Sequence, residues 1–186
     1  MTPRPWRGRV FIGTSADGRI ARDDGSLEWL TDLPSRAHDV DRDPARPALV
    51  WETFFAEVDA IVMGRATYDS VLGFGEWPFD GRHVVVLTTR DDLDDPRIRT
   101  ASSVDDAVRV LGELGARDVY VDGGRTIRAF LRADLIDELT ISVAPVVLGA
   151  GRPLFGELAA DLHLVVRGSH ATDDGLVRTT YDVVRD

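Results

Sequence analysis

Short apolar runs alternate with segments of helical periodicity through the first two thirds of the chain. Strands are predicted at residues 9–14, 60–63, 83–89 and 119–121, and helices at residues 49–58, 67–72, 104–114 and 126–132. Near-continuous apolar runs such as HVVVLTT (83–89) are typical of strands that are covered on both faces. This alternation predicts a mostly parallel sheet with helices packed on both of its faces.

Local signals mark the ends of several of these elements. For the helix at 104–114, Ser103 is a natural N-cap and Gly115 supplies the C-terminal stop. Thr67 is placed to cap or open the short helix that follows the second strand. Residues 19–50 carry little periodicity, so we expect a long irregular segment there, of the kind that can close over an active site.

The last third of the chain is rich in strands. Residues 139–143 alternate polar and apolar side chains and end at Pro145, and residues 162–167 and 176–184 form a predicted antiparallel hairpin. A length of 186 residues allows one domain with a sizeable core. We therefore expect residues 1–186 to form a single three-layer α/β domain with a parallel body and an antiparallel C-terminal edge.

The composition excludes several kinds of chemistry. The chain has no cysteine, which excludes disulfides, thiolate nucleophiles, iron–sulfur clusters and cysteine-ligated zinc. All 22 basic residues are arginine, so neither a lysine Schiff base nor a Walker-type phosphate loop is available. The four histidines lie far apart in the sequence, and no metal site is expected.

The charge and the apolar runs bear on partners and location. A net charge of −10 repels a polyanion at long range, so no nucleic-acid partner is expected. The longest apolar runs are far shorter than the roughly 18 residues that cross a bilayer. The first residues are basic but are not followed by an apolar segment of signal-peptide length. We therefore expect no membrane partner and a cytoplasmic location.

Three predicted strands end in similar ways. The strand at 60–63 ends in G-R-A-T (64–67), the strand at 83–87 ends in T-T-R (88–90), and the strand at 119–121 ends in D-G-G-R-T (122–126). In a parallel sheet these carboxyl ends lie along one edge, where open α/β folds bind their ligands. Glycine, helix N-termini and arginine together suit phosphate groups.

Each turn taken alone has a simpler interpretation, because glycine is common wherever φ must be positive. Three such ends in one chain favour a dinucleotide with several phosphates. Their spacing fits neither GxGxxG nor GxxxxGK[ST], which disfavours those nucleotide-binding folds. Asp122 is unexpected beside a pyrophosphate unless its carboxylate points away or caps its own turn.

These motifs carry a family resemblance. V-M-G-R-A-T-Y (62–68), V-V-V-L-T-T (84–89) and V-Y-V-D-G-G-R-T-I (119–127) resemble the three NADPH-binding turns of the dihydrofolate reductase superfamily. The segments at 14–30 and A-P-V-V-L-G-A-G-R-P-L-F (144–155) are more similar to the reductase domain of the bacterial-type bifunctional riboflavin-biosynthesis deaminase/reductase and its stand-alone relatives. The resemblance runs from about residue 9 to residue 184 and implies a sheet of eight strands, mostly parallel, with the last strand antiparallel.

The resemblance also implies a set of residues that bind NADPH or NADP. One turn would hold the adenosine-side phosphates, the second the adenine and the 2′-phosphate, and the third the pyrophosphate, while an isoleucine from the first loop would line the nicotinamide. In that order the residues are Gly64, Arg65, Ala66 and Thr67; Leu87, Thr88 and Thr89; Gly123, Gly124, Arg125 and Thr126; and Ile20.

The candidate catalytic and substrate-binding residues come from the first loop. Asp17, in S-A-D-G, is placed near the active site by the resemblance, and its alternative role is that of a turn residue without chemistry. Trp29 is a candidate to stack on a flat heterocycle, or else it covers the core. Asp32 is a further substrate-binding candidate.

One departure from true dihydrofolate reductases concerns the substrate. Those enzymes carry a carboxylate in the helix before the V-M-G-R strand, and counting back from Gly64 without a gap places Ala48 there. Glu52 or Glu57 would replace it only if the helix had another register. A folate substrate is therefore not expected.

The resemblance implies an NADPH-dependent oxidoreductase that transfers a hydride to a small heterocycle or a sugar-pyrimidine, similar to 5-amino-6-(5-phosphoribosylamino)uracil reductase. The alternatives are reduction of a pterin, as in dihydrofolate reductases, and a non-catalytic NADP-binding protein. A phosphorylated substrate would need a basic subsite, with Arg19, Arg22 or Arg152 as candidates. Relatives often pair, so a homodimer is a further expectation, with apolar surface offered by Val143, Val146, Val147 and Leu148.

Overall fold

A computed structural model describes residues 4–31 and 47–185. Its elements, in chain order, are β1 (Arg7–Ser15), β2 (Arg19–Ala21), α1 (Glu28–Thr31), α2 (Trp51–Glu57), β3 (Ala60–Gly64), α3 (Arg65–Leu72), β4 (His83–Leu87), β5 (Ile98–Ala101), α4 (Val104–Glu113), β6 (Asp118–Asp122), α5 (Gly124–Arg132), β7 (Glu138–Ala144), β8 (Arg152–Pro153), β9 (His163–Ala171) and β10 (Val177–Val184). Within the described ranges no helix is long and apolar enough to cross a membrane.

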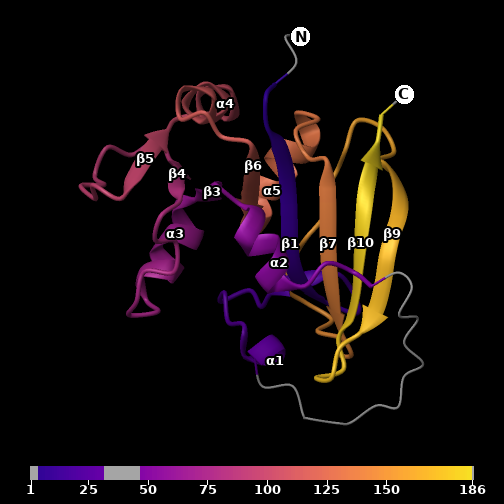
Figure 1. Ribbon diagram of the computed structural model, residues 1–186. Coiled ribbons are helices and arrows are strands. Elements are labelled where there is room, and N and C mark those ends of the chain that lie inside the picture. The colour runs from indigo at the N-terminus through magenta and orange to yellow at the C-terminus, as the bar shows by residue number, and fades with distance from the viewer. Residues whose placement is uncertain (1–3, 32–46, 186) are drawn as a thin grey trace.

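A single eight-stranded sheet organises the molecule, with strand order β5-β4-β3-β6-β1-β7-β10-β9. Every pairing from β5 to β7 is parallel, and β10 pairs antiparallel with both β7 and β9. Figure 1 shows the two antiparallel strands at one side of the sheet and β5 at the other. The expected parallel body and antiparallel C-terminal edge are confirmed.

Helices cover both faces because alternate residues of the central strands are apolar on both sides. In β3, Ala60 and Val62 join the core that α4 and α5 complete. Ile61 and Met63 join the core formed with α2 and α3. All four side chains are fully buried, and burying a side chain the size of isoleucine or methionine contributes about 1.5–3 kcal/mol.

The sequence patterns did not predict the shortest strands or the short helix α1. β5 (IRTA) lies at the edge of the main sheet, and two of its four residues are exposed, so it lacks the apolar run that marked the inner strands. β2 and β8 form a separate two-stranded sheet, and α1 is a single turn. Both β2 and α1 lie in the segment expected to be irregular.

Two helix starts differ from expectation, and one agrees. The N-cap of α3 is Gly64, so Thr67 lies inside the first turn and does not cap the helix. α5 begins at Gly124, two residues earlier than the apolar pattern indicated, because Gly123 turns the chain directly into the helix. The Ser103 side chain accepts a hydrogen bond from Asp106 N, which confirms it as the N-cap of α4.

Candidate functional site

The three similar strand ends meet at one edge of the sheet. β3 pairs with β4 so that Gly64 lies opposite Leu87, and it pairs with β6 so that Met63 lies opposite Asp122. The turns that follow these strands are therefore neighbours. In Figure 1 they lie where α3 and α5 begin, near the centre of the sheet.

Two of the turns interlock through glycine and threonine. A Cβ atom added to Gly123 would lie 2.2 Å from Thr67 Oγ1, so the threonine of one turn fills the space beside the glycine of the other. In the reverse direction, a Cβ atom on Gly64 would lie 3.2 Å from Thr126 Oγ1. Gly123 has a φ of 84°, a conformation that residues with a side chain rarely adopt. The starts of α3 and α5 are thereby held against each other.

The first loop reaches the same place. A Cβ atom on Gly124 would lie 2.3 Å from the Cδ1 atom of Ile20, in β2. Gly124 therefore leaves room for Ile20 to pack against the first turn of α5. This contact joins the loop after β1 to the glycine turn, and the role of Ile20 beside a nicotinamide stays a prediction.

The two helix starts offer unpaired backbone donors. Neither Gly64 nor Gly123 provides a side-chain cap, and the first N–H groups of a helix have no partner within the helix. Such donors, together with the partial positive charge of a helix N-terminus, favour a phosphate group. The geometry of α3 and α5 therefore fits a dinucleotide that carries several phosphates.

The two arginines predicted for the site differ in their surroundings. Arg65 donates from Nε to Asp69 at 2.7 Å and from Nη1 to Asp92 at 2.6 Å, and these hydrogen bonds raise its pKa. A phosphate must therefore compete with two carboxylates for Arg65. Arg125, in the first turn of α5, is exposed.

The end of β4 is the remaining one of the three similar strand ends. Leu87 and Thr88 are partly buried, and Thr89 is exposed. Thr88 N donates to Ala101 O at 2.9 Å, and Thr88 Oγ1 accepts from Arg90 N at 3.1 Å. The turn is thus fixed at Thr88 and open at Thr89.

Asp122 caps its own turn. Its Oδ1 atom accepts a hydrogen bond from Gly123 N at 2.8 Å, the arrangement that makes a carboxylate acceptable next to the glycine pair. Burial raises the pKa of this carboxyl above its ordinary value, although the bond from Gly123 opposes the shift. Tyr120, two residues earlier on β6, donates to Phe11 O at 3.2 Å.

Asp17 holds the loop after β7. Its carboxylate accepts from Leu148 N and Gly149 N, both at 3.0 Å, and from Ser15 Oγ at 2.7 Å. These bonds, the one from Leu148 first, lower the pKa of Asp17 to about 2. The residue is ionised at neutral pH, so its position suits a hydrogen-bond acceptor and loop anchor better than a proton donor. Its predicted role in catalysis stays a prediction.

Of the two candidate substrate-binding residues, the structure describes only Trp29. Trp29 is buried and packs with Ala144 and Leu176, which is the core-covering alternative, and its Nε1 atom has no hydrogen-bond partner among the described residues. Asp32 lies outside the described residues. Stacking by Trp29 on a ring stays a prediction.

The two glutamates of α2 differ in their surroundings. Glu57 accepts from Arg9 Nη1 at 2.6 Å, and Glu52 is exposed. Ala48 is buried, and its N atom donates to His170 Nδ1 at 3.0 Å. The expectation that folate is not the substrate stays a prediction.

Two solved structures share this architecture. A putative riboflavin biosynthesis protein from Shewanella sp. PV-4 superposes with a TM-score of 0.82 at 37% sequence identity, over 96% of this chain and 99% of that one. The dihydrofolate reductase from Enterococcus faecalis, solved in complex with NADP(H) and RAB-propyl, gives a TM-score of 0.66 at 18% identity, over 98% of each chain. The dihydrofolate reductase-like fold is thereby confirmed.

Sequence comparison decides the family. The uncharacterized protein YwjB from Bacillus subtilis is 30% identical over 164 residues, 86% of this chain and 88% of the relative. The model of the RibD C-terminal domain family matches residues 8–178. This chain belongs to the RibD C-terminal domain family. The match contains Asp17, Trp29 and all the predicted cofactor residues.

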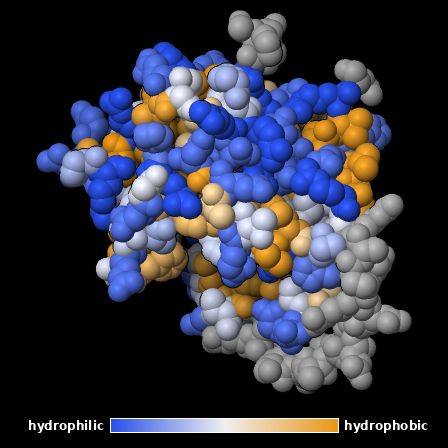
Figure 2. Space-filling view, viewed as in Figure 1, coloured by the Kyte–Doolittle hydropathy of each residue, from blue (hydrophilic) through white to orange (hydrophobic). Residues whose placement is uncertain are grey.

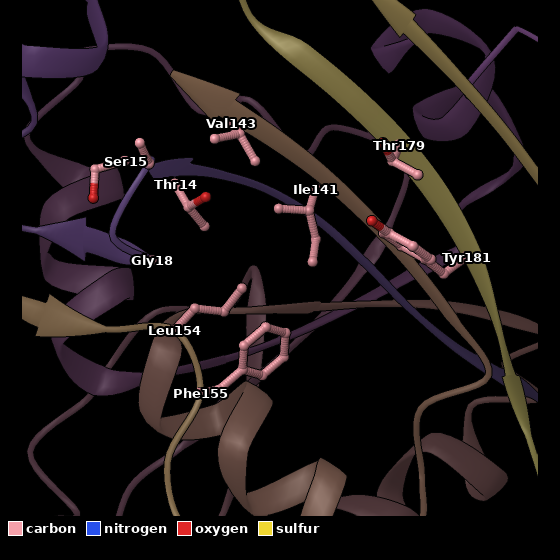
Figure 3. Close-up of a pocket in the computed structure, with 10 residues that line it drawn as sticks. Thr14, Ser15, Gly18, Ile141, Val143, Leu154, Phe155, Thr179 and Tyr181 are labelled. Carbon is pink, nitrogen blue, oxygen red and sulfur yellow. The ribbon is translucent and has the colours of Figure 1, made fainter. Parts of the chain in front are cut away.

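The RibD C-terminal domain also contains a cavity that the sequence did not indicate. It measures about 210 Å³, below the range of about 300–1,000 Å³ of most ligand pockets. It lies on the face of the sheet that packs against α5, and Figure 3 shows Leu154 and Phe155 across it from Ile141 and Tyr181. Its lining comprises Thr14, Ser15, Ala16, Gly18, Ile141, Val143, Leu154, Phe155, Thr179 and Tyr181.

The signal for this cavity was weak, because its walls come from four separate segments. The contiguous clues were the T-S-A-D-G stretch at residues 14–18 and the R-P-L-F motif at residues 152–155. The candidate phosphate ligands near it are already partly engaged: Arg19 Nη1 donates to Gly151 O at 3.2 Å, and Arg152 Nη2 donates to Asp23 O at 2.9 Å. Arg22 is exposed.

Proposed function

We propose that this RibD C-terminal domain is an NADPH-dependent reductase that transfers a hydride to a small heterocyclic or sugar-pyrimidine substrate. The observation that supports the proposal is the interlocked pair of glycine turns at the starts of α3 and α5, closed by Ile20. Glycine occurs there at the points where a side chain would collide, and neither glycine N-cap offers a side-chain acceptor to the first backbone N–H groups of its helix.

NADPH, when bound, would supply the hydride, and the protein would supply binding, orientation and exclusion of water. The first turns of α3 and α5 would hold phosphates, with Arg125 as the exposed cation among them. Ile20 would form an apolar wall for the nicotinamide ring. Of the two carboxyls, Asp122 is the better candidate for a proton source. Burial raises the pKa of Asp122, whereas hydrogen bonds lower the pKa of Asp17.

Binding of the cofactor is the first test. Fluorescence titration should show NADPH binding, and Arg125→Ala should weaken it by roughly tenfold, since hydrogen bonds to a charged group contribute about 1.5–3 kcal/mol. Arg132→Ala is the matched control, because Arg132 is exposed at the other end of the same helix. Absence of NADPH binding at tens of micromolar would contradict the proposal.

Turnover is the second test. NADPH absorbance should fall when pyrimidine or pterin compounds are added. A loss with pyrimidine compounds but not with pterins supports the proposed substrate class, and the reverse supports the dihydrofolate reductase alternative. NADPH binding without turnover of any compound would favour a non-catalytic NADP-binding protein.

A further inference from the structure

Arg178 lies in a polar row that crosses three strands of the sheet. Ser142 of β7 is opposite Gly13 of β1 on one side and opposite Arg178 of β10 on the other. The Arg178 guanidinium lies over the ring of Phe11, 4.9 Å from the ring centroid, which places it on the face of the sheet that α2 covers.

The hydrogen bonding of Arg178 is incomplete. Its Nε atom donates to Ser142 Oγ at 2.8 Å, and within the described ranges neither terminal nitrogen has a hydrogen bond or an ion pair. Arg4 and Arg9, which are also partly buried, donate to carboxylates, whereas in the described ranges Arg19 and Arg128 donate hydrogen bonds to backbone carbonyls from Nη1 alone. Arg178 therefore presents two free donors in a fixed plane.

Arg178 is half-buried, and no carboxylate of the described residues forms an ion pair with it. Leu30 of α1 packs over Gly13, and Leu49 N, in the segment before α2, donates to Thr180 Oγ1 at 2.9 Å. Burial lowers the pKa of Arg178, and the charges of Asp174 and Glu52 oppose the shift only from a distance. An anion at this position would regain the electrostatic energy that burial costs the guanidinium.

The position fits the proposed reductase. β10 is three strands from β6, which carries the glycine turn, so neighbouring-strand spacings separate the two by about 14 Å. A ring reduced beside that turn and bearing a short anionic substituent spans such a distance.

We propose that Arg178 is a specificity-determining residue that binds an oxyanion of the substrate, a carboxylate or a phosphate, through its two terminal nitrogens. The two parallel N–H donors of arginine match the paired oxygens of both groups. The proposal rests on the proposed function and takes the α2 face of the sheet, opposite the face that carries the cavity, as the substrate side. Arg178 would fix the orientation of the substrate, and no part of the hydride transfer depends on it.

Isothermal titration calorimetry of the full chain, with and without NADP⁺, tests the proposal with two matched pairs of compounds. Uracil and orotate differ by a carboxylate, and uridine and uridine 5′-monophosphate differ by a phosphate. At least one anion should bind roughly tenfold more tightly than its neutral partner, as expected for charge-assisted hydrogen bonds. The pair that shows the preference identifies the oxyanion.

Variants separate binding from folding and from long-range charge. Arg178→Met should abolish the preference while leaving the affinity for the neutral compound unchanged, and Arg178→Lys should retain only part of it because the planar fork is lost. Arg99→Met is the matched control, since Arg99 is exposed on β5 at the opposite edge of the sheet.

Three outcomes overturn the assignment. In the first, each anion binds with the same affinity as its neutral partner, or none of the four compounds binds. In the second, Arg178→Met lowers the affinity for neutral and anionic compounds equally. In the third, Arg99→Met loses the anion preference as Arg178→Met does. NADPH titration of the same samples distinguishes the two proposals. Failure of NADPH binding alone contradicts the reductase, whereas loss of the anion preference alone contradicts the role of Arg178.

Discussion

At Gly123, both the backbone conformation and the packing disfavour a side chain. Its φ of 84° disfavours any side chain, and a Cβ atom there would also collide with Thr67 Oγ1. Gly75 has the same φ of 84°, but a Cβ atom there would meet nothing within 4 Å. The two glycines share a positive φ, but the ψ of 132° at Gly123 lies outside the left-handed helical region, so a side chain there is opposed both by the backbone conformation and by the collision.

Gly75→Ala should lower the free energy of unfolding by about 1–2 kcal/mol, the cost of a left-handed conformation, and leave NADPH binding unchanged. Gly123→Ala should cost more, because Thr67 must also move, and should weaken NADPH binding. Urea unfolding and fluorescence titration measure the two effects. Equal losses of stability in both variants, with equal NADPH affinities, would contradict the role of Gly123.

Asp17 gives a pH-dependent prediction. Its folded-state pKa of about 2 lies below the ordinary value of about 3.9, so the ionised carboxylate stabilises the fold above the ordinary value. That contribution is lost as the pH falls toward 2. Asp17→Asn should therefore be less stable than the wild type at pH 7, and thermal unfolding at a series of pH values should show the gap closing between about pH 4 and pH 2. A gap that stays constant with pH would refute the loop-anchor role.

At the scale of elements, a buried ion pair joins β1 to β7. Arg9 Nε donates to Glu138 Oε1 at 2.8 Å, and both side chains are about 1% exposed. Burial opposes the charge of Arg9, but Glu138 and Glu57 outweigh it and raise its pKa. Arg167 of β9 also donates to Glu138, at 2.5 Å, so the same carboxylate links β1, β7 and β9.

Arg9→Met should lower the free energy of unfolding by up to about 3–5 kcal/mol, because it removes one of the two arginines that donate hydrogen bonds to the buried Glu138 carboxylate. Replacing both residues, in Arg9→Met with Glu138→Leu, should recover part of that loss. Arg109→Met is the control: Arg109 pairs with Asp106 and Glu113 on the exposed face of α4, and its loss should cost less than about 1 kcal/mol. Chemical unfolding of the variants measures the difference, and equal losses for Arg9 and Arg109 would contradict the prediction.

At the scale of the whole molecule, the apolar surface lies elsewhere than the sequence indicated. Of the four residues expected to offer it, only Val147 is exposed, since Val146 and Leu148 pack on the cluster around Trp29 and Val143 lines the cavity. β9, the edge strand, instead exposes Leu164, Val165 and Val166. Figure 2 shows this apolar patch at the upper right.

We expect a second copy of the chain to cover β9, because an apolar edge strand with unpaired backbone groups favours pairing with another strand. Sedimentation velocity should then detect a dimer that Val165→Glu together with Val166→Glu converts to a monomer. Val147→Glu, at a more exposed position away from β9, should leave the dimer intact. A wild-type monomer at high micromolar concentration would refute the expectation.

Local patterns in the sequence predicted some elements of the fold and not others. The apolar runs of β3, β4 and β6 predicted the parallel body, and the three similar strand ends predicted which edge would carry the site. β5 was missed because edge strands need little apolar surface. Thr67 suggested an N-cap by residue type alone, whereas its hydroxyl packs against Gly123, a contact between residues 56 positions apart.

By itself, the sequence determined the class of fold, the family and the set of turns that converge, because strand and helix periodicity and glycine positions are local properties of the chain. Tertiary structure alone decided which donors are already engaged. Arg65 is held by two carboxylates and Asp17 by a distant loop, whereas the terminal nitrogens of Arg178, beside Phe11, have no partner among the described residues. Pairing of this kind depends on distances between segments far apart in the chain, which no local pattern records.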